Sequence, residues 1–214
     1  MNIKHALMGA AVSVVALAGA ASAATLSLSA GGYADTIDTS GTGTDPFDLT
    51  AETGLAHGDA LTVFDQANDG GLQVSEPTKI WVTYLGSEAG NETAAFELST
   101  GSNQLFNNQT SSFGDVASFM DDGGFIDFLF RDISDNESIE NGDTGSATSA
   151  SLRMAFADIS ANGRSVIALF GDGAGDTDYD DIAIRISTVT VPAAGLLLLT
   201  AVGGLSFAKR RKKA

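Results

Sequence analysis

Short apolar runs separated by polar, glycine-rich segments recur along residues 24–188. Within several of these runs apolar and polar side chains alternate, which is the period of a strand that buries one face. The connecting segments are rich in Gly, Asn, Asp, Ser and Thr, the residues that favour turns. Eight runs therefore predict strands: Thr25–Ala30, Leu61–Phe64, Thr78–Leu85, Thr93–Ser99, Gly124–Phe130, Ser151–Asp158, Arg164–Phe170 and Asp181–Val189.

The same pattern limits the helical content. No segment keeps a helical apolar period for more than a turn or two, and the best candidate for a short helix is Ser112–Met120. Residues 34–60 and 131–150 read as long polar loops. Eight short strands joined by turn-rich loops favour an all-β fold, an antiparallel β-sandwich or jelly-roll-like single domain over residues 24–188.

The two ends of the chain differ from this body. Lys4, the apolar stretch Ala6–Leu17 and the small residues Ala21–Ala23 form the pattern of a secretory signal peptide over residues 1–23. Residues 189–214 contain the apolar stretch Ala193–Ala208 followed by the basic run Lys209–Lys213. This order predicts a single transmembrane helix whose basic end stays in the cytoplasm, with the body on the other side.

Charge is distributed very unevenly along the chain. All 27 Asp and Glu lie within residues 24–188, together with five of the 11 Lys and Arg, so the body carries a net charge of −22. A body this acidic repels nucleic acid and attracts cations, although the same charge also serves solubility. The chain contains no Cys, which excludes a disulfide framework and a lipid-modified cysteine.

One acidic cluster has the chemistry of a metal site. Five carboxylates fall within ten residues between two predicted strands, and glycines at 171, 173 and 175 let the backbone turn tightly. Ca²⁺ accepts six to eight oxygen ligands in irregular geometry, so it suits such a cluster better than Mg²⁺ does. The predicted calcium ligands are Asp172, Asp176, Asp178, Asp180 and Asp181.

Alternatives to this assignment stay open at the level of sequence. The cluster also fits an acidic, solvated turn, and it is not an EF-hand, because Asp181 and Ser187 stand where that loop needs Gly and Glu. His57 is the only histidine of the body, so a histidine-based triad or zinc site has no partner set. Trp81 and Tyr84 suit either stacking on sugars or a place in the core.

The C-terminal segment resembles the sorting signal of PEP-CTERM proteins, in particular the VPLPA-CTERM variant. The resemblance is carried by Val191-Pro192, by the Leu-rich span with Gly203-Gly204-Leu205, and by Lys209–Lys213; the internal Leu-Pro of the motif is absent. It implies export, processing by an exosortase-type sorting enzyme, and delivery to the cell surface or to exopolysaccharide. In the body, Val82–Gly90 and Ala168–Asp181 are similar to segments of a domain of unknown function that is suspected of binding calcium.

These observations lead to one expected function and two alternatives. We expect a non-enzymatic surface or extracellular-matrix protein, a calcium-stabilised β-sandwich that engages exopolysaccharide and reaches the membrane through its C-terminal helix. One alternative is a secreted carbohydrate-active hydrolase, since paired carboxylates can hydrolyse glycosides. The other is a permanently membrane-anchored protein whose acidic body binds cations.

Overall fold

The computed structural model describes residues 24–39, 48–157, 159–173 and 179–188, and this part of the chain contains fourteen strands in three antiparallel sheets. The only helical elements within these ranges are the four-residue helix α1 (Thr50–Thr53) and a 3-10 turn (Thr144–Ser146). All of the described residues fall in one compact unit. The body is therefore all-β, as the alternating pattern predicts.

The largest sheet has seven strands in the order β2-β3-β12-β13-β14-β5-β8. Their bounds are β2 (Tyr33–Thr36), β3 (Ala60–Asp65), β12 (Arg153–Ala157), β13 (Ser165–Gly171), β14 (Ile182–Thr188), β5 (Thr78–Gly86) and β8 (Val116–Asp121). A four-stranded sheet contains β11 (Glu137–Glu140), β10 (Phe128–Asp132), β6 (Thr93–Glu97) and β7 (Asn103–Asn107). A three-stranded sheet contains β1 (Leu26–Leu28), β4 (Leu72–Val74) and β9 (Gly124–Phe125).

The main core is formed by residues of all three sheets. The Phe130 ring on β10 stacks on the Phe170 ring on β13, with centroids 5.4 Å apart. Tyr84 on β5 similarly meets Phe106 on β7 at 5.7 Å. Because these contacts join the four-stranded sheet to the seven-stranded sheet across one apolar cluster, the arrangement is consistent with a β-sandwich.

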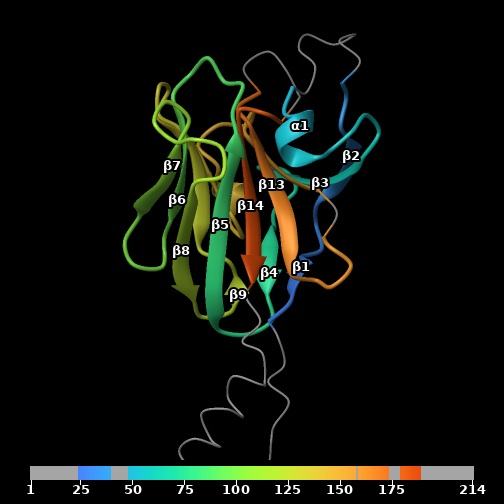
Figure 1. Ribbon diagram of the computed structural model, residues 1–214, viewed down its shortest axis with the longest axis vertical. Helices are drawn as coiled ribbons and strands as arrows, with labels where there is room; N and C mark the ends of the chain where they lie inside the picture. Colours follow the sequence, from blue (N-terminus) through green and yellow to red (C-terminus); the bar gives the residue numbers. More distant parts are fainter. Residues whose placement is uncertain (1–23, 40–47, 158, 174–178, 189–214) are drawn as a thin grey trace, which may run out of the picture. The chain divides into compact units, whose positions relative to one another are not determined.

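A second, smaller apolar cluster lies on the outer face of the seven-stranded sheet. It includes Leu49, at the start of α1, with Leu85 of β5, Leu169 of β13 and Ala183 of β14. Figure 1 shows α1 over the upper end of this sheet, near the ends of β13 and β14. This cluster covers only part of the outer face and lies next to the connection between β13 and β14.

The predicted strands match the structure, with one error and several omissions. Each of the eight predicted runs contains a strand, and Gly124–Phe130 holds β9 and the start of β10, which belong to different sheets. The predicted helix Ser112–Met120 is wrong, because residues 116–120 of this segment belong to the edge strand β8. The predicted loops also contain β11 and α1, and no strong apolar period in the sequence predicts these two elements.

Within the described ranges, no helix has the length and the apolar character needed to cross a bilayer. The predicted signal peptide (residues 1–23) and the predicted C-terminal membrane segment (residues 189–214) lie outside those ranges.

Candidate functional site

The connection between β13 and β14 carries the predicted calcium ligands. Asp172 follows β13 directly, and Asp180 and Asp181 come just before β14. Since β13 and β14 pair as antiparallel neighbours, the residues that leave one strand and enter the other are brought to the same end of the sheet. All three are buried, with exposed fractions of 8%, 1% and 7%. Asp176 and Asp178 lie outside the described residues.

Asp180 fastens a distant part of the chain to this connection. Its carboxylate Oδ2 accepts a hydrogen bond of 2.6 Å from the backbone N–H of Asp48, which comes just before α1. Its backbone carbonyl accepts a bond of 2.8 Å from the N–H of Glu88, just after β5. The loop before α1 and the end of β5 are thus both held at Asp180.

Asp181 adds contacts with a third segment. Its backbone carbonyl accepts hydrogen bonds from the hydroxyls of Ser87, at 2.6 Å, and Thr93, at 2.8 Å. Its carboxylate Oδ2 accepts a bond of 2.5 Å from the backbone N–H of Asp172, which closes the base of the β13–β14 connection. Apart from Asp172, these hydrogen-bond donors to Asp180 and Asp181 lie at least 88 residues away in the sequence.

Tyr179 shows that this connection holds an unusual backbone shape. It is 2% exposed and has a φ of +63°, a left-handed conformation that a bulky residue adopts only under local constraint. Its phenol donates a hydrogen bond of 2.6 Å to the carboxylate of Asp35. Burial raises the pKa of this phenol and the bond to Asp35 raises it further, so Tyr179 stays a donor at any physiological pH.

This arrangement is compatible with binding a hard cation. A carboxylate offers two oxygens and about four lone-pair positions, so accepting one backbone N–H does not prevent it from ligating Ca²⁺. Among the described residues, however, no three His, Cys, Asp or Glu side chains are grouped closely enough to hold a metal ion. The calcium site stays a prediction, and it needs Asp176 and Asp178, which lie outside the described ranges.

A second acidic region surrounds Glu97 at the end of β6. Glu97 is buried, and its carboxylate accepts hydrogen bonds from the hydroxyls of Ser99 and Thr100, both at 2.6 Å, and from the side-chain amide of Asn103. Burial alone would raise the pKa of this carboxyl group, but the hydrogen bonds outweigh it and lower the pKa to about 2. In its charged form, the Glu97 carboxylate therefore stabilises the turn between β6 and β7.

We expect Glu97→Gln to destabilise the fold at neutral pH by about 2 kcal/mol, because the charged form is favoured in the folded state. The stabilising contribution of a carboxyl group with a lowered pKa is present above its ordinary pKa of 4.5 and is lost as the pH falls toward 2. Urea unfolding curves of variant and wild type should therefore differ at pH 7 and converge near pH 2.

Glu137→Gln is the matched control, because Glu137 is half-buried in β11 and its carboxylate accepts no hydrogen bond from any described residue. It should cost much less stability at pH 7 than Glu97→Gln does. Equal losses of stability for Glu97→Gln and Glu137→Gln at pH 7 would contradict the structural role of Glu97.

Two neighbouring carboxyl groups respond to pH in the opposite sense. Burial raises the pKa of Asp127, and the nearby charges of Asp121 and Asp122 raise it further. Burial and the charge of Asp143 raise the pKa of Glu140 in the same way. A raised pKa means that the protonated form favours folding. Protonation of Asp127 and Glu140 at low pH therefore partly offsets the stability that is lost when Glu97 is protonated.

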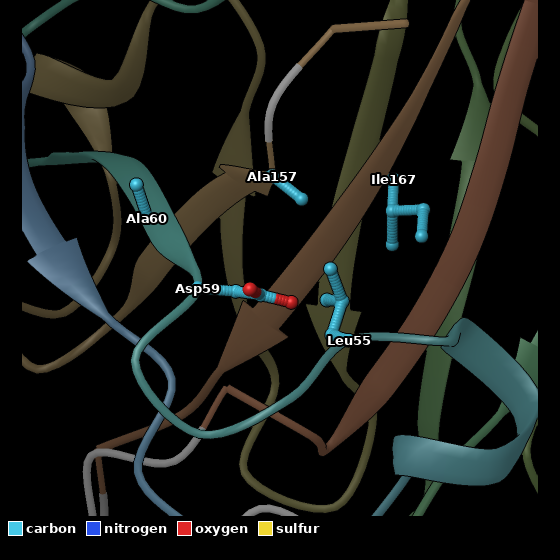
Figure 2. A pocket seen from close by; sticks show the side chains of 5 residues that line it. All are labelled: Leu55, Asp59, Ala60, Ala157 and Ile167. Carbon is cyan, nitrogen blue, oxygen red and sulfur yellow. The ribbon is translucent and has the colours of Figure 1, made fainter.

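The described residues also line a small pocket of about 220 Å³ outside the sheet. Figure 2 shows Leu55 and Asp59, from the segment between α1 and β3, pointing toward each other beside Ile167 of β13. Asp59 is the one titratable residue among those that line it, and its carboxylate accepts a hydrogen bond of 2.8 Å from the backbone N–H of Ala56. Asp59 therefore closes a turn, and the pocket does not bring together the two carboxylates of a glycoside hydrolase.

No protein-family model, curated protein or solved structure matches this chain. The resemblance of residues 191–213 to a sorting signal therefore stays a prediction.

Proposed function

We propose that this chain is a non-enzymatic exported protein of the cell surface or extracellular matrix, in which Ca²⁺ stabilises a jelly-roll-like β-sandwich. Residues 1–23 direct export and are removed. Residues 189–214 hold the precursor in the membrane and present it to an exosortase-type sorting enzyme. The mature body, with a net charge of −22, then engages exopolysaccharide at the cell surface.

The observation that carries this proposal is the burial of Asp172, Asp180 and Asp181 at the one connection that fastens three distant segments. The carboxylates of Asp180 and Asp181 each accept a backbone N–H, and a buried carboxylate held in this way can still ligate a cation. A cation that joins them to Asp176 and Asp178 would fix this connection and, through it, the loop before α1 and the end of β5.

The non-enzymatic role is supported by what the other buried acids do. Asp121 accepts the backbone N–H groups of Gly123 and Asp127. Asp132 accepts the N–H of Asp135 and the side-chain amide of Asn91. With Glu97, these side chains hold turns in place, which is a structural use of a carboxylate.

Saturating Ca²⁺ should raise the melting temperature of the full chain, and a chelator should reverse the shift. At a free concentration 100 times the dissociation constant, a ligand that binds only the folded state adds about 2.7 kcal/mol of stability. For a domain of this size the shift is about 5–10 °C. Mg²⁺ at the same concentration should produce a smaller shift, because it prefers smaller, octahedral sites.

Asp178→Asn and Asp122→Asn form a matched pair for this experiment, since each removes one negative charge. Asp178 is chosen because replacing Asp180 or Asp181 would also break hydrogen bonds that hold the fold. The Ca²⁺ shift should disappear in Asp178→Asn and persist in Asp122→Asn, an exposed position after β8. A shift of equal size in both variants would mean that Ca²⁺ acts only by screening the acidic body.

Export and processing are tested by tagging the chain at two places. One epitope is inserted in the body at Gly90, in the loop between β5 and β6, where a side chain would meet no neighbouring atom. The other follows Ala214. After cell fractionation, the body epitope should be found on the cell surface or in the medium without the C-terminal epitope. Both epitopes on one mature membrane-bound chain would reject processing.

A further inference from the structure

The outer face of the seven-stranded sheet is divided into two halves. One half lies in the apolar cluster that includes Leu49 of the α1 region. In the other half, the outward side chains of β8, β5 and β14 are exposed or half-buried. We call this half the open face, and it consists of Lys79, Trp81, Thr83, Val116, Ser118, Met120, Arg185 and Ser187.

The open face carries two cations and no carboxylate, although the body around it is strongly acidic. Strands β8, β5, β14 and β13 together contain a single carboxylate, Asp121, which is buried. Lys79 and Arg185 are exposed. The one ion pair between described residues joins His57 to Asp38, so no described carboxylate neutralises either cation of the open face. With 27 acidic residues in the chain, this separation of charge sets the open face apart from the rest of the body.

Trp81 occupies the centre of the open face. In the strand register it lies opposite Ser118 on β8 and opposite Ser187 on β14, so hydroxyl groups flank the indole across the sheet. The Lys79 ammonium lies 4.5 Å from the centroid of the indole, a cation–π contact. Arg185 pairs with Thr83, two positions after Trp81, so the backbone positions of Lys79 and Arg185 lie roughly 14 Å apart along the strands, while the Lys79 ammonium itself lies over the indole ring.

We infer that the open face binds an anionic polysaccharide, a polymer that carries carboxylate or sulfate groups on its sugar rings. The exposed part of the indole offers apolar surface to the C–H groups of a sugar ring, beside the Lys79 ammonium. The serine hydroxyls exchange hydrogen bonds with sugar hydroxyls, and Lys79 and Arg185 pair with acid groups of the polymer. This inference deepens the proposed function and rests on it, because only an exported body would meet such a polymer.

A single polymer chain fits the open face better than a lipid surface does. A bilayer extends far beyond three strands and would meet the acidic residues that surround the open face, and a body of charge −22 repels an anionic bilayer. A polysaccharide chain needs only the width of the open face. At physiological ionic strength the screening length is about 8 Å, so acidic residues farther than this from the polymer repel it only weakly.

The fluorescence of Trp81, the only tryptophan of the chain, reports directly on the open face. The full chain in a non-ionic detergent is titrated with polygalacturonate, dextran sulfate and neutral dextran. Both acidic polymers should change the intensity or wavelength of the emission, to a smaller extent at high salt, and neutral dextran should not. If only one acidic polymer binds, its charged group identifies the ligand chemistry as carboxylate or sulfate.

Matched variants assign the binding to this face. Arg185→Gln should weaken the affinity for polygalacturonate about tenfold, a loss of about 1.4 kcal/mol. Arg131→Gln removes the same charge from β10 of the four-stranded sheet and should change the affinity less than twofold. Trp81→Ala, followed by affinity electrophoresis in gels that contain polygalacturonate, should lose its retardation while keeping a cooperative thermal unfolding transition.

The inference is overturned if the emission of Trp81 stays unchanged with both acidic polymers, or if neutral dextran binds as tightly as they do. It is also overturned if Arg185→Gln and Arg131→Gln lose the same affinity for polygalacturonate. A fourth contrary result is a response to detergent micelles doped with phosphatidylglycerol that exceeds the response to the polymers. The last result would assign the open face to a lipid surface.

The failure of this inference and the failure of the proposed function give different results. A chain that is exported and stabilised by Ca²⁺ but does not bind the acidic polymers would refute the polysaccharide site alone. A chain that binds them through Arg185 but melts independently of Ca²⁺ would refute the calcium site alone.

Discussion

Replacing Asn141 by alanine is expected to lower the free energy of unfolding by about 3 kcal/mol, because it leaves the buried N–H of Leu72 without a partner and removes one of the two hydrogen bonds to each of the carbonyls of Leu72 and Ile126. Asn141 is 4% exposed and follows β11. Its side-chain oxygen accepts the N–H of Leu72 at 2.7 Å, and its amide donates to the carbonyls of Leu72 and Ile126, both at 2.8 Å. This one side chain joins the end of the four-stranded sheet to the three-stranded sheet.

Asn141→Asp keeps the volume of the side chain and changes only its hydrogen-bonding groups. It retains the acceptor for Leu72 but places a second oxygen against two carbonyl groups, so it should be at least as destabilising as alanine at pH 7. Asn162→Ala, at an exposed position, should cost less than about 1 kcal/mol. Urea unfolding of the three variants provides the comparison, and an Asn141→Ala loss no larger than that of Asn162→Ala would contradict the account.

Phe130→Ala is expected to cost about 4 kcal/mol, since it removes a fully buried ring from the contact between two sheets. The Phe130 ring stacks on Phe170 and meets the Phe128 ring edge-on, with centroids 5.6 Å apart in the second pair. A cavity at this position would weaken the packing of β10 against β13, and neighbouring side chains of a close-packed interior can fill it only in part.

Phe113→Ala is the matched control for the core substitution. Phe113 is 66% exposed, so its truncation should change the free energy of unfolding by no more than about 0.5 kcal/mol. Thermal unfolding monitored by circular dichroism distinguishes the two variants. Similar losses at both positions would mean that Phe130 does not lie in the main core.

Strand β5 illustrates how far the alternation of side chains predicts the fold. The alternation correctly places Ile80, Val82 and Tyr84 on one face, and all three are buried. Trp81 and Leu85 share the other face, yet Leu85 is 1% exposed while Trp81 is half-buried. The difference arises because the α1 region covers only one end of β5, and a two-residue period contains no information about such a cover.

The segment Ser112–Met120 shows where a short apolar run misleads. Its apolar residues also fit a helical turn, and helix and strand cannot be separated by period alone in so short a run. In the structure Val116, Ser118 and Met120 are exposed while Phe119 is buried, which is the period of an edge strand. Pairing with β5 decides the outcome, and that pairing depends on residues 78–83 of a distant segment.

The site could be predicted only in part for a similar reason. The hairpin that brings Asp172 near Asp181 follows from two predicted strands that are neighbours in the sequence. The groups that bind Asp180 and Asp181, such as Asp48 and Thr93, come from 132 and 88 residues away and carry no local signal. Long-range hydrogen bonds of this kind emerge only from the folded topology.

Calorimetric titration of the full chain with Ca²⁺ tests the central claim most directly, since it measures binding without heating the protein. We predict saturable binding in the wild type, its loss in Asp178→Asn, and its retention in Asp122→Asn. An absence of binding heat at several temperatures in the wild type, or the same titration curve in Asp178→Asn, would contradict a calcium site at the β13–β14 connection.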